Sequence, residues 1–296
     1  MMALGGSRTR QTRGSVSCHH PRVSYSAPDY WSELHRRDDL SAVGQAALPA
    51  EFNRWLYRIL ARNLRAFIRR RELASPPPAR LFDVGAGIGV WIPFWRDLGV
   101  TRIDGCDLVP AAVERLNERF GDTGTFVVAE LGDSSGGGLP VDQRYPLVTV
   151  FNVLLHITDD ERFDRALGQI AKLVQPGGSL LLVEPILRDP SYSVPYVSTM
   201  HSRARPLGDY AGPLRAAGLE QMDLLAAVVL AGNPMEAGSR AAFRRYQRIW
   251  KWVARQTKRS AASARWIGPV LSAADRIALL TGAAPSSKIA RFRRPV

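Results

Sequence analysis

Residues 81–89 decide the fold, with the sequence Leu81-Phe82-Asp83-Val84-Gly85-Ala86-Gly87-Ile88-Gly89. The first four residues are a short run typical of a buried strand, and a helical pattern follows from Trp91 to Leu98. Glycines between a strand and a helix allow a tight turn and let a ligand approach the main chain. A Gly-x-Gly pattern is weak evidence alone, since ordinary turns have it too. Its meaning therefore depends on the neighbouring strands.

Acidic residues stand at the ends of three successive predicted strands. Asp83 lies two residues before the first glycine, where a carboxylate can receive a cationic amino group but would repel a pyrophosphate. Asp107 ends the next strand, 20 residues after Gly87, which is the expected spacing for an acid that binds ribose hydroxyls. Glu130 and Leu131 end the third strand, within reach of an adenine amine and ring. An acid at a strand end can also cap a helix, so a structural role is the alternative for each.

Strand and helix patterns alternate from Ala79 to Pro185. Further strands are predicted at Arg102–Leu108, Thr125–Ala129, Pro146–Val153 and Ser179–Val183, and helices at Pro110–Phe120 and Asp160–Val174. This alternation predicts a parallel sheet covered by helices on both faces. The fourth strand ends at Val150-Phe151-Asn152-Val153, close to the glycine loop in such a sheet. All these strand ends lie at the carboxyl edge, where open α/β sheets bind ligands.

The flanking segments divide the chain into three parts. Residues 1–27 contain no acid and predict a disordered basic tail; they lack the apolar core of a secretory signal, although an organelle transit peptide has a similar composition. Residues 28–75 predict an N-terminal helical extension, because residues 51–73 have helical periodicity and prolines follow. We expect residues 76–296 to form the main domain, with a helical insertion at about 235–282.

The segment after Pro185 predicts a helix at Leu207–Ala217, a strand at Gln221–Leu230, the insertion, and a last strand at Ser287–Phe292. No acidic residue occurs between Glu236 and Asp275. Basic residues there are Arg240, Arg244, Arg245, Arg248, Lys251, Arg255, Lys258, Arg259 and Arg265, and an apolar helical face consists of Phe243, Tyr246, Ile249, Trp250 and Val253. Such a helix can lie on a membrane surface or on nucleic acid, or it can cover the pocket with its cations in water.

The composition limits the class of protein. Apolar residues make up 46% of the 296 residues, enough for a sizeable core, and no apolar run reaches the roughly 18 residues of a membrane span. The net charge of +13 fits a solvated basic surface, an anionic substrate, nucleic acid or an anionic membrane. Only Cys18 and Cys106 are present, far apart, so neither a disulfide framework nor a zinc site is predicted. We expect a cytoplasmic protein, with a peripheral position at a membrane left open.

Residues 79–185 resemble the class I (Rossmann-like) S-adenosylmethionine-dependent methyltransferases. The stretch Leu81–Gly89 is similar to their first motif, Asp107-Leu108 to their ribose-binding acid, Tyr145–Ile157 to their fourth-strand motif, and Leu173–Glu184 to their helix-turn-strand. The resemblance implies an α/β fold with a seven-stranded, mostly parallel sheet whose last strand is antiparallel. It also implies S-adenosylmethionine as the cofactor.

The candidate cofactor-binding residues combine the strand ends with this resemblance. They are Asp83, Gly85, Ala86, Gly87, Asp107, Leu108, Glu130, Leu131 and Asn152, together with Tyr30 and Trp31. The last two are included because aromatics in an N-terminal extension often form a lid over the cofactor in the family that the chain resembles. Packing of the extension onto the core is the alternative for these aromatics.

Methyl transfer needs alignment of the reactants and a base when the nucleophile carries a proton. His156, at the end of the fourth strand, and His201, in the loop after the fifth, are the candidate catalytic bases; each has a structural or surface histidine as its alternative. Neither has a second ligand at a metal-binding spacing, so no metal is predicted.

The fourth strand also bears on the acceptor. It lacks the Asn-Pro-Pro-Tyr motif of enzymes that methylate flipped-out adenine, and no cysteine lies near it. A small-molecule acceptor is therefore favoured over a nucleobase. Our first hypothesis is an acceptor with an oxygen nucleophile, and an anionic or membrane-associated acceptor stays open. The alternatives are an RNA methyltransferase and a non-catalytic cofactor-binding module.

Overall fold

The structure is a computed structural model, and it describes residues 26–36, 39–45, 48–73, 76–135, 137–188, 198–199 and 201–296. Residues 1–25 of the predicted tail, including Cys18, lie outside the described residues. Ser26 and Ala27, which fall within the predicted tail, begin the first helix, where the Ser26 hydroxyl accepts a hydrogen bond from the backbone N–H of Asp29.

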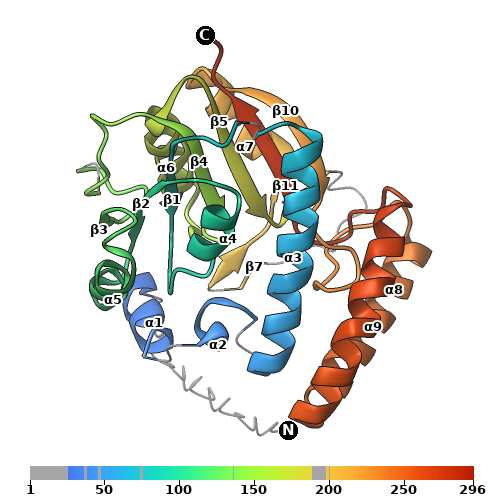
Figure 1. The fold of residues 1–296 in the computed structure, drawn as a ribbon. Coiled ribbons are helices and arrows are strands. Elements are labelled where there is room, and N and C mark those ends of the chain that lie inside the picture. Colours follow the sequence, from blue (N-terminus) through green and yellow to red (C-terminus); the bar gives the residue numbers. More distant parts are fainter. Residues whose placement is uncertain are drawn as a thin grey trace, which may run out of the picture.

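A seven-stranded sheet forms the centre of the fold (Figure 1). Its strands are β1 (Arg80–Val84), β2 (Arg102–Asp107), β3 (Phe126–Val128), β4 (Tyr145–Phe151), β5 (Val174–Glu184), β10 (Glu220–Ala226) and β11 (Lys288–Arg293). The spatial order is β10-β11-β5-β4-β1-β2-β3. Strands β1 to β5 pair in parallel, whereas β11 is antiparallel to both β5 and β10. The predicted Rossmann-like sheet with an antiparallel last strand is confirmed.

Helices cover both faces of this sheet. They are α1 (Ala27–Leu34), α2 (Leu40–Val43), α3 (Ala50–Arg70), α4 (Ile92–Asp97), α5 (Pro110–Phe120), α6 (Asp160–Leu173), α7 (Leu207–Ala216), α8 (Arg240–Thr257) and α9 (Ala261–Leu279). Apolar side chains of α3, α4, α5 and the α8–α9 pair share one core with the sheet, and those of α6 and α7 share the other. Figure 1 shows α3 and α4 in front of the sheet and α1 and α2 below it.

Short strands extend the carboxyl edge of the sheet. Strand β6 (Ile186–Leu187) pairs with β9 (Arg205–Pro206), and β7 (Ser198–Thr199) pairs with β8 (Ser202–Arg203). The β7–β8 turn contains His201. A single 3-10 turn, η1 (Leu154–His156), follows β4 at the same edge. These elements bring the two candidate histidines to one end of the sheet.

Strand β5 begins at Val174 instead of Ser179, because the predicted turn of proline and two glycines forms a bulge within it. Pairing with β4 shifts from Tyr145–Val174 to Leu147–Ser179. Gly177 adopts φ +75°, a left-handed conformation that glycine tolerates, and its N–H donates to the carbonyl of Arg294. The glycines therefore belong to β5, where they connect the bulge to the end of β11. They do not form a turn between α6 and β5.

Strand β10 is shorter than predicted, because the chain after Ala226 turns away to bind the helices of the front layer. The carbonyl of Ala227 accepts a hydrogen bond from Asn63 Nδ2 of α3 at 2.8 Å. The carbonyl of Val228 accepts one from Ser286 Oγ at 2.9 Å. Side chains from distant parts of the chain therefore bind the carbonyl groups of this segment, in place of a neighbouring strand.

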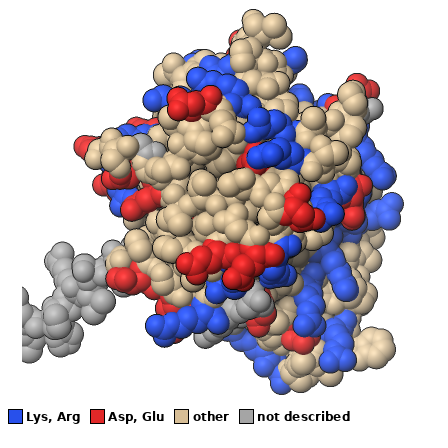
Figure 2. All heavy atoms as spheres, turned by 60° about the vertical axis from the view of Figure 1, so that its left-hand side comes forward, with Lys and Arg blue, Asp and Glu red and all other residues tan. Residues whose placement is uncertain are grey.

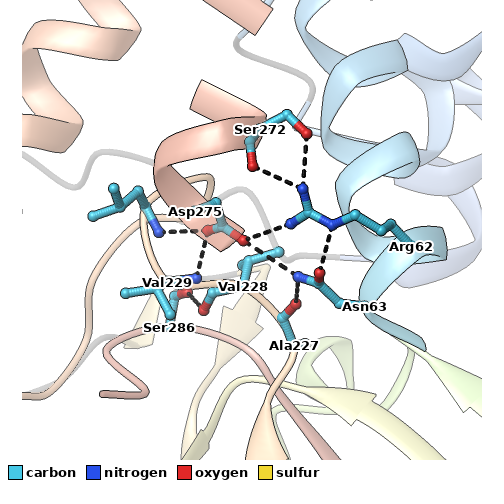
Figure 3. Close-up of polar contacts among 9 residues, drawn as sticks. Arg62, Asn63, Ala227, Val228, Val229, Ser272, Asp275 and Ser286 are labelled. Carbon is cyan, nitrogen blue, oxygen red and sulfur yellow. Dashed lines mark hydrogen bonds and ion pairs between the residues drawn. The ribbon is translucent and has the colours of Figure 1, made fainter. Parts of the chain in front are cut away.

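The predicted insertion is a hairpin of two helices, α8 and α9, which pack against α3 (Figure 1). Asp275 of α9 is fully buried and joins the hairpin to the rest of the fold (Figure 3). Its Oδ1 accepts hydrogen bonds from the backbone N–H groups of Val229 and Leu230, each at 2.8 Å. Its Oδ2 faces Arg62 at 3.4 Å and Asn63 Nδ2 at 3.2 Å, both on α3. One carboxylate thus connects three segments.

Candidate functional site

A cavity of about 290 Å³ lies at the carboxyl ends of β1, β2, β3 and β4. The predicted site residues that line it are Trp31, Gly85, Ala86, Gly87, Asp107, Leu108, Glu130, Leu131, Asn152 and His156. Asp83, Tyr30 and His201 are not among its lining residues. The strand ends that the sequence predicts to converge therefore do so, and the other three predicted residues are not part of the cavity lining.

The glycine loop leaves space at the cavity wall because Gly85 and Gly87 have no side chains. Gly85 and Gly87 adopt φ +71° and +59°, conformations that favour glycine. A Cβ at Gly87 would lie 2.9 Å from Val43 Cγ1 of α2, and one at Gly85 would collide with Val153. The N–H groups of Gly85 and Ala86 donate to the carbonyl of Cys106 at 2.8 and 2.9 Å. The loop is thus tied to the end of β2, with no room for larger residues.

Asp107 holds this loop from the side. Its Oδ2 accepts a hydrogen bond from the backbone N–H of Gly87 at 2.8 Å, and its Oδ1 accepts one from Val109 at 3.0 Å. Each carboxylate oxygen has two lone pairs, so both retain accepting capacity toward the cavity. The carboxylate is 7% exposed and lines the cavity. It can therefore orient the loop and accept hydrogen bonds from ligand hydroxyls at once.

Asp83 lies beneath the loop. Its Oδ1 accepts a hydrogen bond from Thr149 Oγ1 at 2.6 Å, and the side chain is buried. Burial raises the pKa of Asp83 to about 7, although the bond from Thr149 opposes this rise. A cation in the cavity would favour the ionised form of this carboxyl, even without touching it.

His156 and His201 lie together, but they differ in their relation to the cavity. His156 Nδ1 lies 2.6 Å from the backbone oxygen of His201, and since a carbonyl only accepts, Nδ1 carries the proton and Nε2 the lone pair. The His156 ring meets Trp31 edge-on at 4.6 Å, while the His201 ring stacks on Tyr30 at 4.6 Å. Burial lowers the pKa of His156 to about 4, so this histidine is neutral at pH 7.

Glu184 positions the turn that carries His156, a role that the sequence analysis missed. Its carboxylate accepts hydrogen bonds from the backbone N–H groups of Val153, Leu154 and Leu155 at 2.7, 2.9 and 3.2 Å. It is fully buried, and burial raises its pKa to about 8 despite these donors. Glu184 ends β5, so the same pattern of acids at strand ends could have identified it.

His35, four residues after Trp31 in the same N-terminal extension, is a further cavity residue. It is 4% exposed, lines the cavity, and lies near Gly87, whose Cβ would approach His35 Cε1 to 3.7 Å. Within the described part of the chain, its Nδ1 has no hydrogen-bond partner. Burial lowers the pKa of His35, and the charge of Asp107 partly opposes this. A buried ring nitrogen without a partner at a cavity wall suits a ligand hydrogen bond.

A family model described as a methyltransferase domain matches residues 52–226, which is more than half of the chain. The chain belongs to this methyltransferase family. The match runs from α3 to the end of β10 and so includes the glycine loop, Asp107 and His156. A comparison with curated proteins found no match.

Solved structures of similar fold have low sequence identity to this methyltransferase. The [4+2]-cyclase SpnF is 20% identical, with 73% of this chain and 75% of that chain covered and a TM-score of 0.45. A putative sarcosine dimethylglycine methyltransferase from Galdieria sulphuraria is 17% identical, with 73% and 78% covered and a TM-score of 0.44. CalS10, an amino pentose methyltransferase from Micromonospora echinaspora solved with its methyl donor bound, is 17% identical, with 58% and 86% covered and a TM-score of 0.44.

The expected enzyme class and cofactor are confirmed: this is an S-adenosylmethionine-dependent methyltransferase. The cavity fits that cofactor in three ways. Asp107 offers an acceptor for ribose hydroxyls, the glycine loop exposes main chain, and the buried His35 Nδ1 has no protein partner among the described residues. Among the described residues, no cluster of three or more His, Cys, Asp or Glu could hold a metal, and no helix is long and apolar enough to cross a membrane.

Proposed function

We propose that this methyltransferase transfers the methyl group of S-adenosylmethionine to a small molecule that presents an oxygen nucleophile. The position of His156 carries the proposal, because its Nε2 is unprotonated and the residue lines the cavity. A neutral imidazole nitrogen facing a ligand cavity can accept the proton of a hydroxyl group.

The cofactor residues have separate roles in this proposal. Asp107 binds the ribose hydroxyls, and the main chain of Gly85, Ala86 and Gly87 lies against the methionine part of the cofactor. Glu130 and Leu131 bind the adenine, with Arg162 paired to Glu130 at the rim of the cavity. Leu108, Asn152 and Trp31 complete the lining. Asp83 acts from beneath by its charge, and Tyr30 acts through His201 and Trp31.

The N-terminal extension supports a small acceptor. Ala27 and Trp31 of α1, His35, and Val43 of α2 line the same cavity as the glycine loop. These residues cover the site from the side opposite the sheet, and Figure 1 shows α1 and α2 below the carboxyl edge. A covered cavity suits a molecule that enters whole, whereas a nucleic acid strand needs an open groove.

The chemistry follows from the state of His156. When bound, the cofactor supplies an electrophilic methyl group on a sulfonium. His156 Nε2 accepts a hydrogen bond from the acceptor hydroxyl and so directs an oxygen lone pair toward that methyl. As the oxygen–methyl bond forms and the sulfur–methyl bond breaks, the hydroxyl proton becomes strongly acidic, and Nε2 takes it despite its lowered pKa of about 4. The products are the methyl ether or ester, S-adenosylhomocysteine and a proton.

The test separates binding from transfer. We expect Asp107→Ala to weaken cofactor binding by about 1–3 kcal/mol in calorimetry, because the ribose hydroxyls lose a charged acceptor. His156→Gln should retain cofactor affinity and lose a factor of about 10² or more in methyl transfer from radiolabelled cofactor to a metabolite extract. The exposed Asp142→Ala is the matched control for the acidic site. Unchanged cofactor affinity in a folded Asp107→Ala variant would refute the ribose assignment.

The same assay separates the alternatives. Label recovered in RNA would make this an RNA methyltransferase, and cofactor binding without any transfer would favour a non-catalytic module. An anionic or membrane-associated acceptor also belongs to the proposal, because exposed cations cover the outer face of α8. Mass spectrometry of the labelled product identifies the acceptor and the methylated atom.

A further inference from the structure

The apolar stripe of α8 is not the surface that faces outward. Ile249, Trp250 and Val253 pack into the core shared with α3, and the Trp250 ring lies 5.9 Å from that of Phe52. The sequence pattern predicts an amphipathic helix, and the structure shows that its apolar side covers the protein. A partner of the hairpin must therefore contact a different face.

Helix α9 instead exposes a second apolar face. Trp266 is 80% exposed, Val270 69%, Ile277 67% and Leu280, directly after the helix, 83%. These positions share one side of the helix at about 100° per residue and extend about 21 Å along it. The opposite side faces the protein and is buried. Its residues are Ala264, Gly268, Leu271 and Asp275.

This inner side fixes the orientation of α9. Gly268 lies so close to the Trp55 ring of α3 that a Cβ there would collide with it, and Asp275 makes the buried contacts described above. The helix cannot rotate its exposed apolar residues inward without breaking these contacts. Large apolar side chains gathered on a fixed outer face are a common sign of an interaction surface.

The hairpin that carries this apolar face also exposes many cations. Arg265 and Arg276 are exposed along one border of it on α9. The neighbouring helix α8 and the turn after it expose Arg240, Arg244, Arg245, Arg248, Lys251, Arg255, Lys258 and Arg259. Trp252, 52% exposed, lies among them, and residues 237–274 contain no acid. On the face shown in Figure 2, Lys and Arg are densest on the right-hand side.

We propose that the outer face of α9 docks on the surface of an anionic lipid bilayer. Trp266, Val270, Ile277 and Leu280 enter the boundary between headgroups and acyl chains, and the cations of the hairpin lie against the headgroups. This inference is independent of the acceptor proposed above, although a docked hairpin would favour an acceptor that dissolves in the membrane.

Two other occupants fit the surface less well. A second copy of the chain would bring two acid-free, basic hairpins together, and like charges at an interface oppose association. A nucleic acid would satisfy the cations but leave Val270, Ile277 and Leu280 without an apolar partner, since phosphate contacts carry most of that binding. Only a surface that is anionic outside and apolar beneath matches both the exposed apolar face of α9 and the exposed cations of α8.

Co-sedimentation of the full chain with vesicles tests the proposal. We expect binding to vesicles of phosphatidylglycerol and phosphatidylcholine at low salt, little binding to pure phosphatidylcholine, and release at high salt. Replacing Trp266, Val270, Ile277 and Leu280 together by Gln should weaken vesicle binding at least tenfold. Neutralising a single cation of the hairpin should weaken vesicle binding about fivefold. Met222→Gln with Leu225→Gln, which removes exposed apolar groups on β10, is the matched control and should bind as the parent does.

Each contrary outcome overturns the docking. The first is that the protein does not sediment with anionic vesicles at low salt, and the second is that the β10 control loses as much vesicle binding as the four-Gln variant. The third is a dimer of the parent that the four Gln substitutions dissociate, and the fourth is binding of RNA but not of vesicles. Calorimetry with the cofactor verifies that every variant is folded. Methyl transfer to a soluble acceptor is measured without vesicles, so failure of the docking and failure of the proposed function give different results.

Discussion

The cavity and the α8–α9 hairpin use charge in opposite ways. Around the cavity, the carboxylates of Asp107 and Glu184 are buried and accept hydrogen bonds from backbone N–H groups. On the hairpin, the cations are exposed, and no acid accompanies them from residue 237 to residue 274. A buried acidic group with fixed hydrogen-bond partners determines the local geometry, whereas exposed charges of one sign act over a longer range and leave the geometry free.

One contact connects the two regions. Asp275 belongs to the hairpin, but it is buried like the cavity acids and binds Arg62 and Asn63 of α3. The same helix contributes Tyr57 to the cavity wall. The comparison therefore predicts that loss of Asp275 lowers the stability of the fold and that cavity variants weaken cofactor binding. It also predicts that removal of the exposed cations leaves cofactor binding unchanged.

Asp275→Ala should cause the largest effect. It removes the acceptor of one buried and one partly buried backbone N–H group and the partner of a partly buried arginine, which costs about 3–5 kcal/mol of unfolding free energy. Chemical denaturation followed by circular dichroism measures this. Asp142→Ala, at an exposed position, should change the free energy by less than about 0.5 kcal/mol. Equal stabilities of the two variants would show that the contacts of Asp275 do not stabilise the fold.

Gly87→Val should abolish cofactor binding, with a loss of about 10²-fold or more. The left-handed φ of +59° strains any branched residue, and the added side chain meets Val43 and enters the cavity. Calorimetry measures the binding, and circular dichroism verifies the fold. Gly168→Val is the matched control, because no atom lies within 4 Å of a Cβ at Gly168 in α6. Normal binding by Gly87→Val would reduce the loop to an ordinary turn.

The pH dependence of stability distinguishes a buried neutral histidine from an exposed one. The pKa of His156 is lowered to about 4 in the folded protein, below its usual 6.5, so its contribution to stability is complete above pH 6.5 and is lost as pH falls toward 4. Between pH 7 and 5.5, the parent should lose about 1 kcal/mol more of unfolding free energy than His156→Gln.

Denaturant titrations of both proteins at each pH measure that difference. Asp83, whose pKa is raised to about 7, acts with the opposite sign, since its protonated form favours the folded state. Asp83 is present in both proteins, so the comparison isolates the histidine. Parallel curves for the two proteins would mean that His156 titrates in the folded state as it does in the unfolded chain.

The two regions also differ in how far sequence predicts them. The glycine loop, Asp107 and Glu130 follow from local patterns, because strand ends and short spacings determine where these residues converge. Arg62 and Asp275 are 213 positions apart, and only the folded chain shows that they meet. Alternation along a strand does not tell that Asp83 turns away from the cavity toward Thr149.

Helix α9 shows a further limit of pattern analysis. It has apolar residues on two sides, so periodicity alone cannot choose the side that packs on α3. Buried Asp275 and the close approach of Gly268 to Trp55 decide the orientation, and neither is visible in the spacing of apolar residues. The exposed face at Trp266 and Val270 is consequently a finding of the structure.

The smallest expected effect is on cofactor affinity when the α8 cations are removed. Replacing Arg244, Arg245, Arg248 and Lys251 by Gln should leave the calorimetric cofactor affinity within about twofold of the parent. All four side chains are exposed and absent from the cavity lining, and water and salt screen their charges over the distance to the site. The matched positive control is Arg162→Gln, because Arg162 lines the cavity and pairs with Glu130. A large loss in the four-cation variant would mean that the hairpin shapes the cofactor site directly, and the separation of the two regions would then fail.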